Sequence, residues 1–156
     1  MKNVILFASI IVGSGLLLTN IYTSLVDTRS WGTDIPNSIA AAREYFKAVN
    51  PGNFFRLISP LNQVLALLAL IVCWKAVPGV RLYLGIALVL YVLGDVMTFA
   101  YFYPRNDQLF MVKPMPSADV LKKIWNEWVT MNWVRSLVVL AGLVCSCFSL
   151  HKIYTQ

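Results

Sequence analysis

Residues 81–103 read RLYLGIALVLYVLGDVMTFAYFY, a nearly unbroken apolar run in which Asp95 is the only acid. At about 1.5 Å per residue, a helix of this length can cross the roughly 30 Å hydrocarbon core of a bilayer. Similar runs occupy residues 4–26, 57–77 and 118–150. We therefore predict an integral membrane protein with four spans rather than a soluble enzyme.

The composition agrees with this interpretation. Of the 156 residues, 58% are hydrophobic and only 13% are charged, whereas about a quarter of the residues in a soluble domain are charged. The four spans take up most of the chain and leave no room for a soluble catalytic or nucleotide-binding unit. The predicted fold is a single all-α domain, residues 1–156, in which a four-helix bundle runs up-down-up-down.

The segments between the spans differ in length. Residues 77–81 form a turn too short to hold a site, whereas the prolines at 104, 114 and 116 end the third span and keep the next connection extended. In the first long loop, Arg43, Glu44 and Lys47 lie off an apolar pattern that ends at Asn50-Pro51-Gly52. This pattern predicts a short amphipathic helix whose apolar positions are Ile39, Ala42, Tyr45, Phe46 and Val49.

The basic residues, which give a net charge of +6, are scattered near the ends of the spans. They form no aromatic-basic motif that binds RNA, so we expect no nucleic-acid partner and interpret the charge as membrane anchoring. The end that holds both termini carries Lys2, Lys75, Arg81 and Lys152 without any acid. By the positive-inside rule, we expect the plasma (inner) membrane with both termini in the cytoplasm.

The three cysteines and the single histidine favour no redox or metal site. Cys145 and Cys147 lie within the last span, Cys73 lies near the end of the second, and His151 follows the last apolar run. An odd number of thiols within spans favours neither a disulfide framework nor a four-ligand zinc site. One histidine also excludes bis-histidine haem binding by a single chain, so we predict no cofactor and no metal.

Each span carries a polar group that is costly inside a membrane. Measured from the end that holds the termini, Asn20, Asn62, Asp95 and Arg135 lie about 20–30 Å along their helices. Asn132 lies three residues before Arg135 and therefore shares its helix face. We predict that Asp95 and Arg135 form an ion pair, because either charge alone at this depth would be strongly unfavourable.

This polar layer lies beneath the two long loops. Small residues at Gly13, Gly15, Gly94 and Gly142 are expected to leave room deeper in the bundle. An outward-facing, mostly aromatic cavity with a few fixed polar groups suits a small hydrophobic or aromatic ligand. The predicted ligand-binding residues are Asn20, Tyr22, Asn62, Thr98, Tyr101, Asn106, Trp128 and Asn132.

Three stretches resemble motifs of the anthrone oxygenase-like family of four-span membrane proteins, also described as a domain of unknown function. They are NIYTSLVD at 20–27, TFAYFYPRNDQL at 98–109 and WVTMNWVR at 128–135. The resemblance implies the four-span fold, and family members of known activity oxidise polyketide anthrones with molecular oxygen without evident metal or flavin. In the family a His-Pro pair usually follows the acid of the first motif, whereas here Thr28-Arg29 follows Asp27.

A cofactor-independent oxygenase needs a base that removes an acidic proton and donors that hold the resulting anion. The candidate catalytic residues are Asp27 or Asp95 as the base and Arg135 as the anion holder, helped by Asn106, Asn132 or Tyr22. No phosphate loop or nucleophile-base pair favours a kinase or a hydrolase.

Two other functions stay open. The polar groups can instead join the helices of a non-enzymatic membrane scaffold or partner subunit. A small transport component is the third alternative, in which a homo-oligomer encloses the path.

Overall fold

The computed structural model describes residues 2–76 and 78–155, which form helices and short connections without any strand. The four long helices are α1 (Lys2–Tyr22), α4 (Pro51–Val72), α5 (Pro78–Met97) and α7 (Ala118–Tyr154). Val77 of the predicted turn and the side chain of Lys2 lie outside the described residues. The continuous helical segments Asn3–Trp31, Pro51–Val72, Gly79–Met111 and Ala118–Tyr154 are each long and apolar enough to cross a membrane.

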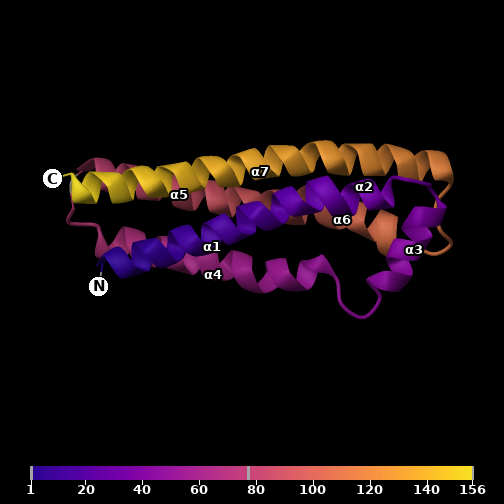
Figure 1. Cartoon of the computed structure of the whole chain (residues 1–156), viewed down its shortest axis with the longest axis horizontal. Coiled ribbons are helices and arrows are strands. Elements are labelled where there is room, and N and C mark those ends of the chain that lie inside the picture. Colours follow the sequence, from indigo (N-terminus) through magenta and orange to yellow (C-terminus); the bar gives the residue numbers. More distant parts are fainter. Residues whose placement is uncertain (1, 77, 156) are drawn as a thin grey trace.

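Figure 1 shows the four long helices packed side by side, with both chain ends at one end of the molecule. We call this the terminal end, and the opposite end, where α3 lies, the outer end. Helix α5 packs along α7, and α1 packs along both α4 and α7. Many apolar side chains point away from these contacts, including the highly exposed Ile11, Val89 and Leu137. Such an apolar outer surface suits contact with lipid chains.

Helix α4 begins at Pro51 and ends at Val72, rather than spanning 57–77 as predicted. Asn50 caps its start, because its side-chain oxygen accepts a hydrogen bond from Gly52 N at 2.9 Å while Asn53 Oδ1 accepts one from Asn50 N at 3.2 Å. Pro51 occupies a first-turn position, where no backbone N–H is needed. Asn50-Pro51-Gly52 therefore starts a span and does not end the amphipathic helix.

Helices α1 and α5 continue through π-helical turns. Helix α1 leads into η1 (Thr23–Asp27) and α2 (Thr28–Trp31), and α5 leads into η2 (Thr98–Phe102), α6 (Tyr103–Asn106) and η3 (Asp107–Met111). The prediction that Pro104 ends the third span is wrong, because Pro104 lies in the first turn of α6. Two of these π turns directly follow the predicted polar layer, and π turns within helices often mark functional sites.

The helix predicted in the first long loop is present as α3 (Asn37–Tyr45). Its Ile39 and Ala42 are buried in an outer cluster, together with Trp31, Phe102, Leu109, Leu121 and Trp128. Trp31 and Trp128 meet edge to face with ring centroids 5.4 Å apart. Tyr45 and Val49 stay exposed, because the helix stops at Tyr45 and the apolar pattern does not continue around it.

Arg43 on α3 fastens this helix to the end of the third span. Its guanidinium donates hydrogen bonds to the carbonyl oxygens of Leu109 at 2.7 Å, Val112 at 2.9 Å and Gln108 at 3.0 Å. Carbonyls at the end of a helix lack partners within the helix, so the arginine takes the place of the missing N–H groups. Burial lowers the pKa of Arg43, although an arginine remains protonated at neutral pH.

We predict that Arg43→Lys loosens the outer end. The planar guanidinium reaches three carbonyl oxygens at once, and a compact lysine ammonium cannot replace all three hydrogen bonds. The free energy of unfolding should fall by about 1–2 kcal/mol, and amide hydrogen exchange at residues 108–112 should accelerate. Lys47→Ala is the matched control, because the Lys47–Glu44 ion pair is exposed and should contribute less than about 0.5 kcal/mol. Unchanged exchange in Arg43→Lys would contradict this role.

Candidate functional site: a buried polar layer

Arg135 on α7 is the charged centre of the layer and is only 7% exposed. Its Nη2 donates to Asn132 Oδ1 at 2.5 Å and its Nη1 donates to Thr98 Oγ1 at 3.2 Å. The guanidinium carbon lies 4.1 Å from the ring centroid of Phe102 and 5.5 Å from that of Phe55. Neutral acceptors and aromatic rings therefore surround this cation, and the Nε–H has no hydrogen-bond partner.

Asp95 on α5 has different partners from those predicted. Its carboxylate accepts hydrogen bonds from Ser59 Oγ and from Gln63 Nε2, the latter at 2.6 Å. Among the described residues no ion pair joins Asp95 to Arg135, so the predicted direct contact is wrong. Ser59 and Gln63 lie four residues apart on α4, so both face α5 and engage the carboxylate first.

Asn132 is fully buried and joins α7 to the first span. Its Nδ2 donates to the backbone oxygen of Asn20 at 3.1 Å and to Ser24 Oγ at 2.6 Å, while its Oδ1 accepts from Arg135. Asn20, Ser24 and Thr28 follow one another at intervals of four and are all buried. The π turn η1 keeps this polar face directed toward α7.

The layer also contains polar atoms that have no partner. Across residues 2–76 and 78–155, the buried side-chain atoms without a hydrogen bond are Asn20 Oδ1, Asn62 Nδ2, Asn62 Oδ1 and Arg135 Nε. Asn62 is 1% exposed, and a buried amide without partners is energetically unfavourable. Two of these atoms are donors and two are acceptors, and they belong to three different membrane-compatible helices.

Tyr22 and the glycines are not arranged as the sequence predicts. Tyr22 is 56% exposed and points away from the layer. A Cβ added to Gly13 would lie 2.9 Å from Tyr91 Oη, and one added to Gly142 would lie 3.0 Å from the Tyr91 ring. These two glycines therefore accommodate Tyr91, which fills the space that sequence analysis assigned to a ligand, whereas Gly15 has no neighbour within 4 Å.

Other predicted site residues lie at the outer end. Asn106 Oδ1 accepts from Trp128 Nε1 at 2.8 Å, which joins α6 to α7 within the outer cluster. Asp27 is half-buried in η1 beside the Thr23 hydroxyl. The structure therefore brings Asn20, Asn132, Thr98 and Arg135 into direct contact, whereas Asn106 and Trp128 form a separate pair above them.

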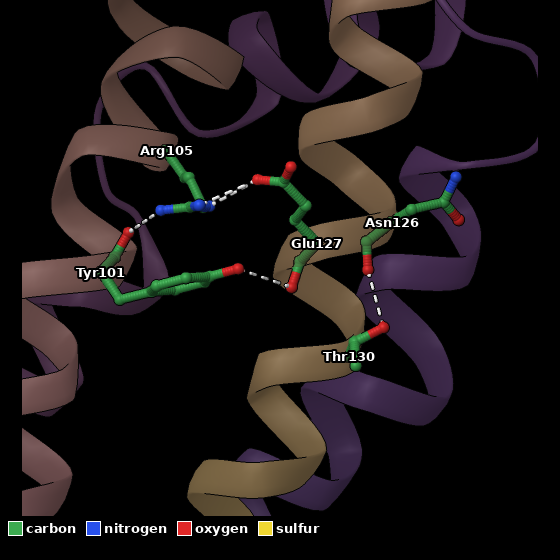
Figure 2. A network of polar contacts seen from close by, with 5 residues as sticks. All are labelled: Tyr101, Arg105, Asn126, Glu127 and Thr130. Atoms are coloured by element: carbon green, nitrogen blue, oxygen red, sulfur yellow. Dashed lines mark hydrogen bonds and ion pairs between the residues drawn. The ribbon is translucent and has the colours of Figure 1, made fainter.

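Tyr101 belongs to a third group, in which Arg105 lies between Tyr101 and Glu127 (Figure 2). Arg105 Nη2 contacts Glu127 Oε2 at 2.8 Å, and its guanidinium carbon lies 3.4 Å from the centroid of the Tyr101 ring. The Tyr101 hydroxyl donates to the Glu127 carbonyl at 3.3 Å. In this network Glu127 neutralises the charge of Arg105, and the contacts join η2 and α6 to α7. Tyr101 therefore contacts Arg105 and Glu127 rather than Arg135.

Sequence analysis assigned no role to Ser59, Gln63, Ser24 or Phe55. A usable signal existed for α4, because Ser59, Asn62 and Gln63 recur at helical spacing within one span. No comparable signal marks Phe55, which resembles any other lipid-facing aromatic residue.

A model of the anthrone oxygenase family matches residues 52–145, more than half of the chain. The chain belongs to the anthrone oxygenase family. No curated protein and no solved structure matches it. The family match includes Asn62, Asp95, Asn132 and Arg135. It begins at residue 52 and therefore does not include Asn20. Within the described part of this anthrone oxygenase family member, no cluster of three His, Cys, Asp or Glu residues could hold a metal ion.

We predict that Asn132→Ala destabilises the protein, because it removes two bonds to the first span and one acceptor of a buried cation. The free energy of unfolding in detergent micelles should fall by about 2–4 kcal/mol. Thr130→Ala is the matched control on the same helix, because Thr130 is exposed and bonds only to Asn126 O of its own helix (Figure 2). Equal stabilities of the two variants would contradict the bridging role of Asn132.

Proposed function

We propose that this chain is a single-domain, up-down-up-down four-helix membrane enzyme that oxidises a small, weakly acidic aromatic molecule with molecular oxygen. The observation that carries the proposal is the set of unpaired buried atoms on Asn20, Asn62 and Arg135, within a polar layer largely covered by the family match. A bound ligand with one ionisable oxygen and a neighbouring polar group would satisfy these atoms.

The surroundings of Arg135 favour a flat anion. The free Nε–H can donate to a phenolate or enolate oxygen, and the Phe102 and Phe55 rings beside the guanidinium make the surroundings of this donor apolar and aromatic. In a water-poor interior such a donor stabilises developing negative charge more strongly than water does. We therefore assign Arg135 the role of anion holder. Asn62, whose Oδ1 lies close to Gly13 on α1, is proposed as a second polar contact deeper in the bundle.

Asp95 is the proposed base. The family name points to anthrones, in which a CH2 group between two aromatic rings is acidic because the anion is a delocalised phenolate. Asp95, oriented by Ser59 and Gln63, accepts a proton from this CH2 group, and Arg135 holds the oxygen of the resulting anion. We prefer Asp95 to Asp27 because the partner of the Asp27 side chain is the Thr23 hydroxyl of its own helix, whereas Asp95 is held by two side chains of α4.

The proposed reaction balances without a further oxidant. The carbanion carbon forms a bond to one atom of O2, and protonation gives a hydroperoxide. The hydroperoxide then loses water as the remaining C–H bond breaks and the C=O bond forms. The substrate CH2 is oxidised to a ketone by four electrons, one oxygen atom enters that ketone, and the other leaves as water.

The charges at the terminal end support an orientation of the protein in the membrane. We place both termini in the cytoplasm of a cell with an inner (plasma) membrane, because the terminal end carries Lys75, Arg81 and Lys152 without an acid. The polar layer then lies in the outer half of the bundle beneath the outer cluster. The bilayer and the aromatic substrate are the proposed partners.

A non-enzymatic scaffold is the second candidate, and the bonds of Asn132 to Asn20 and Ser24 favour it. These bonds join two helices whether or not a ligand is present. A scaffold would lose stability upon substitution of the layer but would have no activity to lose.

We predict that Asp95→Asn slows anthrone oxidation by a factor of about 100 or more, since the amide cannot accept the proton. Arg135→Lys keeps the charge but removes the planar guanidinium with its Nε–H donor, and it should slow the reaction by a factor of about 10–1000. The measurement is oxygen uptake with quinone absorbance, using a hydroxylated anthrone and protein in nanodiscs, with protein-free nanodiscs as the baseline.

Thr130→Ala serves as the control and should retain the wild-type rate. Wild-type rates in both Asp95→Asn and Arg135→Lys would contradict the assigned roles. A folded wild-type protein that does not exceed the baseline would favour the scaffold.

A further inference from the structure

The terminal end carries positive charge without any acid nearby. All seven acidic residues of the chain lie within 27–44 and 95–127, which belong to the outer part of the molecule. The helices of the terminal end are held together by a buried apolar cluster of Leu6, Ala69, Cys73, Val80 and Leu84. The cations of this end are Lys75, Arg81 and Lys152, and among the described residues none of them forms an ion pair.

Aromatic rings hold two of these cations in place. The Arg81 guanidinium carbon lies 5.6 Å from the centroid of the Trp74 ring, and Lys152 Nζ lies 5.5 Å from that of Tyr83. Lys152 Nζ also rests on Gly79, where an added Cβ would lie 2.6 Å from it. A ring orients a cation without cancelling its charge, so both cations stay available to an anion.

A hollow of about 480 Å³ lies at the end of α4, beside Lys75 and the Trp74 ring that contacts Arg81. Ile71, Val72 and Trp74 supply apolar walls, and Lys75 supplies a charged edge. Trp74 thus connects both cations, because it lines the hollow together with Lys75 and its ring contacts the Arg81 guanidinium. An apolar hollow with a cationic rim suits a molecule that has an apolar chain and an anionic group.

We propose that Lys75 and Arg81 bind the phosphate of an anionic phospholipid, whose acyl chain lies in the hollow against Ile71 and Val72. The ends of membrane-spanning helices lie at the level of the lipid headgroups, where cations attract anionic lipids. Arginine and lysine are the side chains that bind phosphate most effectively. A free phosphate shares this chemistry, but it would leave the apolar hollow unused.

Trp74 provides a local probe, because the other four tryptophans, at 31, 125, 128 and 133, lie in the outer part of the chain. The full-length protein is placed in phosphatidylcholine nanodiscs that contain a small fraction of either brominated phosphatidylglycerol or brominated phosphatidylcholine. Subtracting the fluorescence of the Trp74→Phe variant isolates the quenching of Trp74. We expect phosphatidylglycerol to quench Trp74 at least threefold more strongly than phosphatidylcholine at the same fraction.

The double variant Lys75→Gln/Arg81→Gln should reduce this ratio to one, while brominated phosphatidylcholine still quenches as in the wild type. The matched control Lys122→Gln/Lys123→Gln removes the same charge at the outer end and should keep the ratio. Equal quenching by both lipids in the wild type, or a ratio that survives the double variant, would overturn the proposal. Loss of the preference in excess inorganic phosphate would overturn it in favour of a soluble anion.

Discussion

A guanidinium inside membrane-compatible helices must find its acceptors within the protein, because the hydrocarbon core offers no hydrogen-bonding groups. Arg135 meets this requirement with two neutral acceptors, Asn132 and Thr98, and with the faces of two phenylalanine rings. Asn132 is therefore oriented by the arginine, and it passes the constraint on to the first span through Asn20 and Ser24. The hydrogen bonds that one buried cation requires thus help to fix how α7, the first span and the third span lie relative to one another.

The apolar regions on either side protect this polar layer from water. At the outer end, the outer cluster packs Trp31 and Trp128 edge to face, and Arg43 holds α3 against the last turn of the third span. Toward the terminal end, Tyr91 fills the gap between Gly13 and Gly142. Low water access strengthens every electrostatic interaction within the layer. The same property makes an unpaired donor or acceptor costly, and it gives a polar ligand a reason to bind there.

Sequence reasoning could find the depth of polar groups but not the direction in which each one points. Helical rise places Asp95 and Arg135 at one level, yet their direct pairing fails because Ser59 and Gln63 on α4 face the carboxylate. Each helix rotation depends on packing, and the π turns that shift the faces of the first and third spans have no evident signal in the sequence. Span number and the amphipathic helix were predictable because they rest on apolar periodicity. The start of α4 was not, because Asn50-Pro51-Gly52 suits either end of a helix.

The central claim is that the unpaired atoms of the layer hold a small aromatic ligand, and native mass spectrometry of protein gently extracted from its own membrane tests it most directly. Asn62→Leu is a near-isosteric change that removes both unpaired amide atoms. We expect an aromatic molecule to be bound to the wild-type protein and to be lost from the folded variant. A wild-type protein without a ligand, together with a variant of higher thermal stability, would contradict the claim, because Asn62 would then be a buried polar group with nothing to bind.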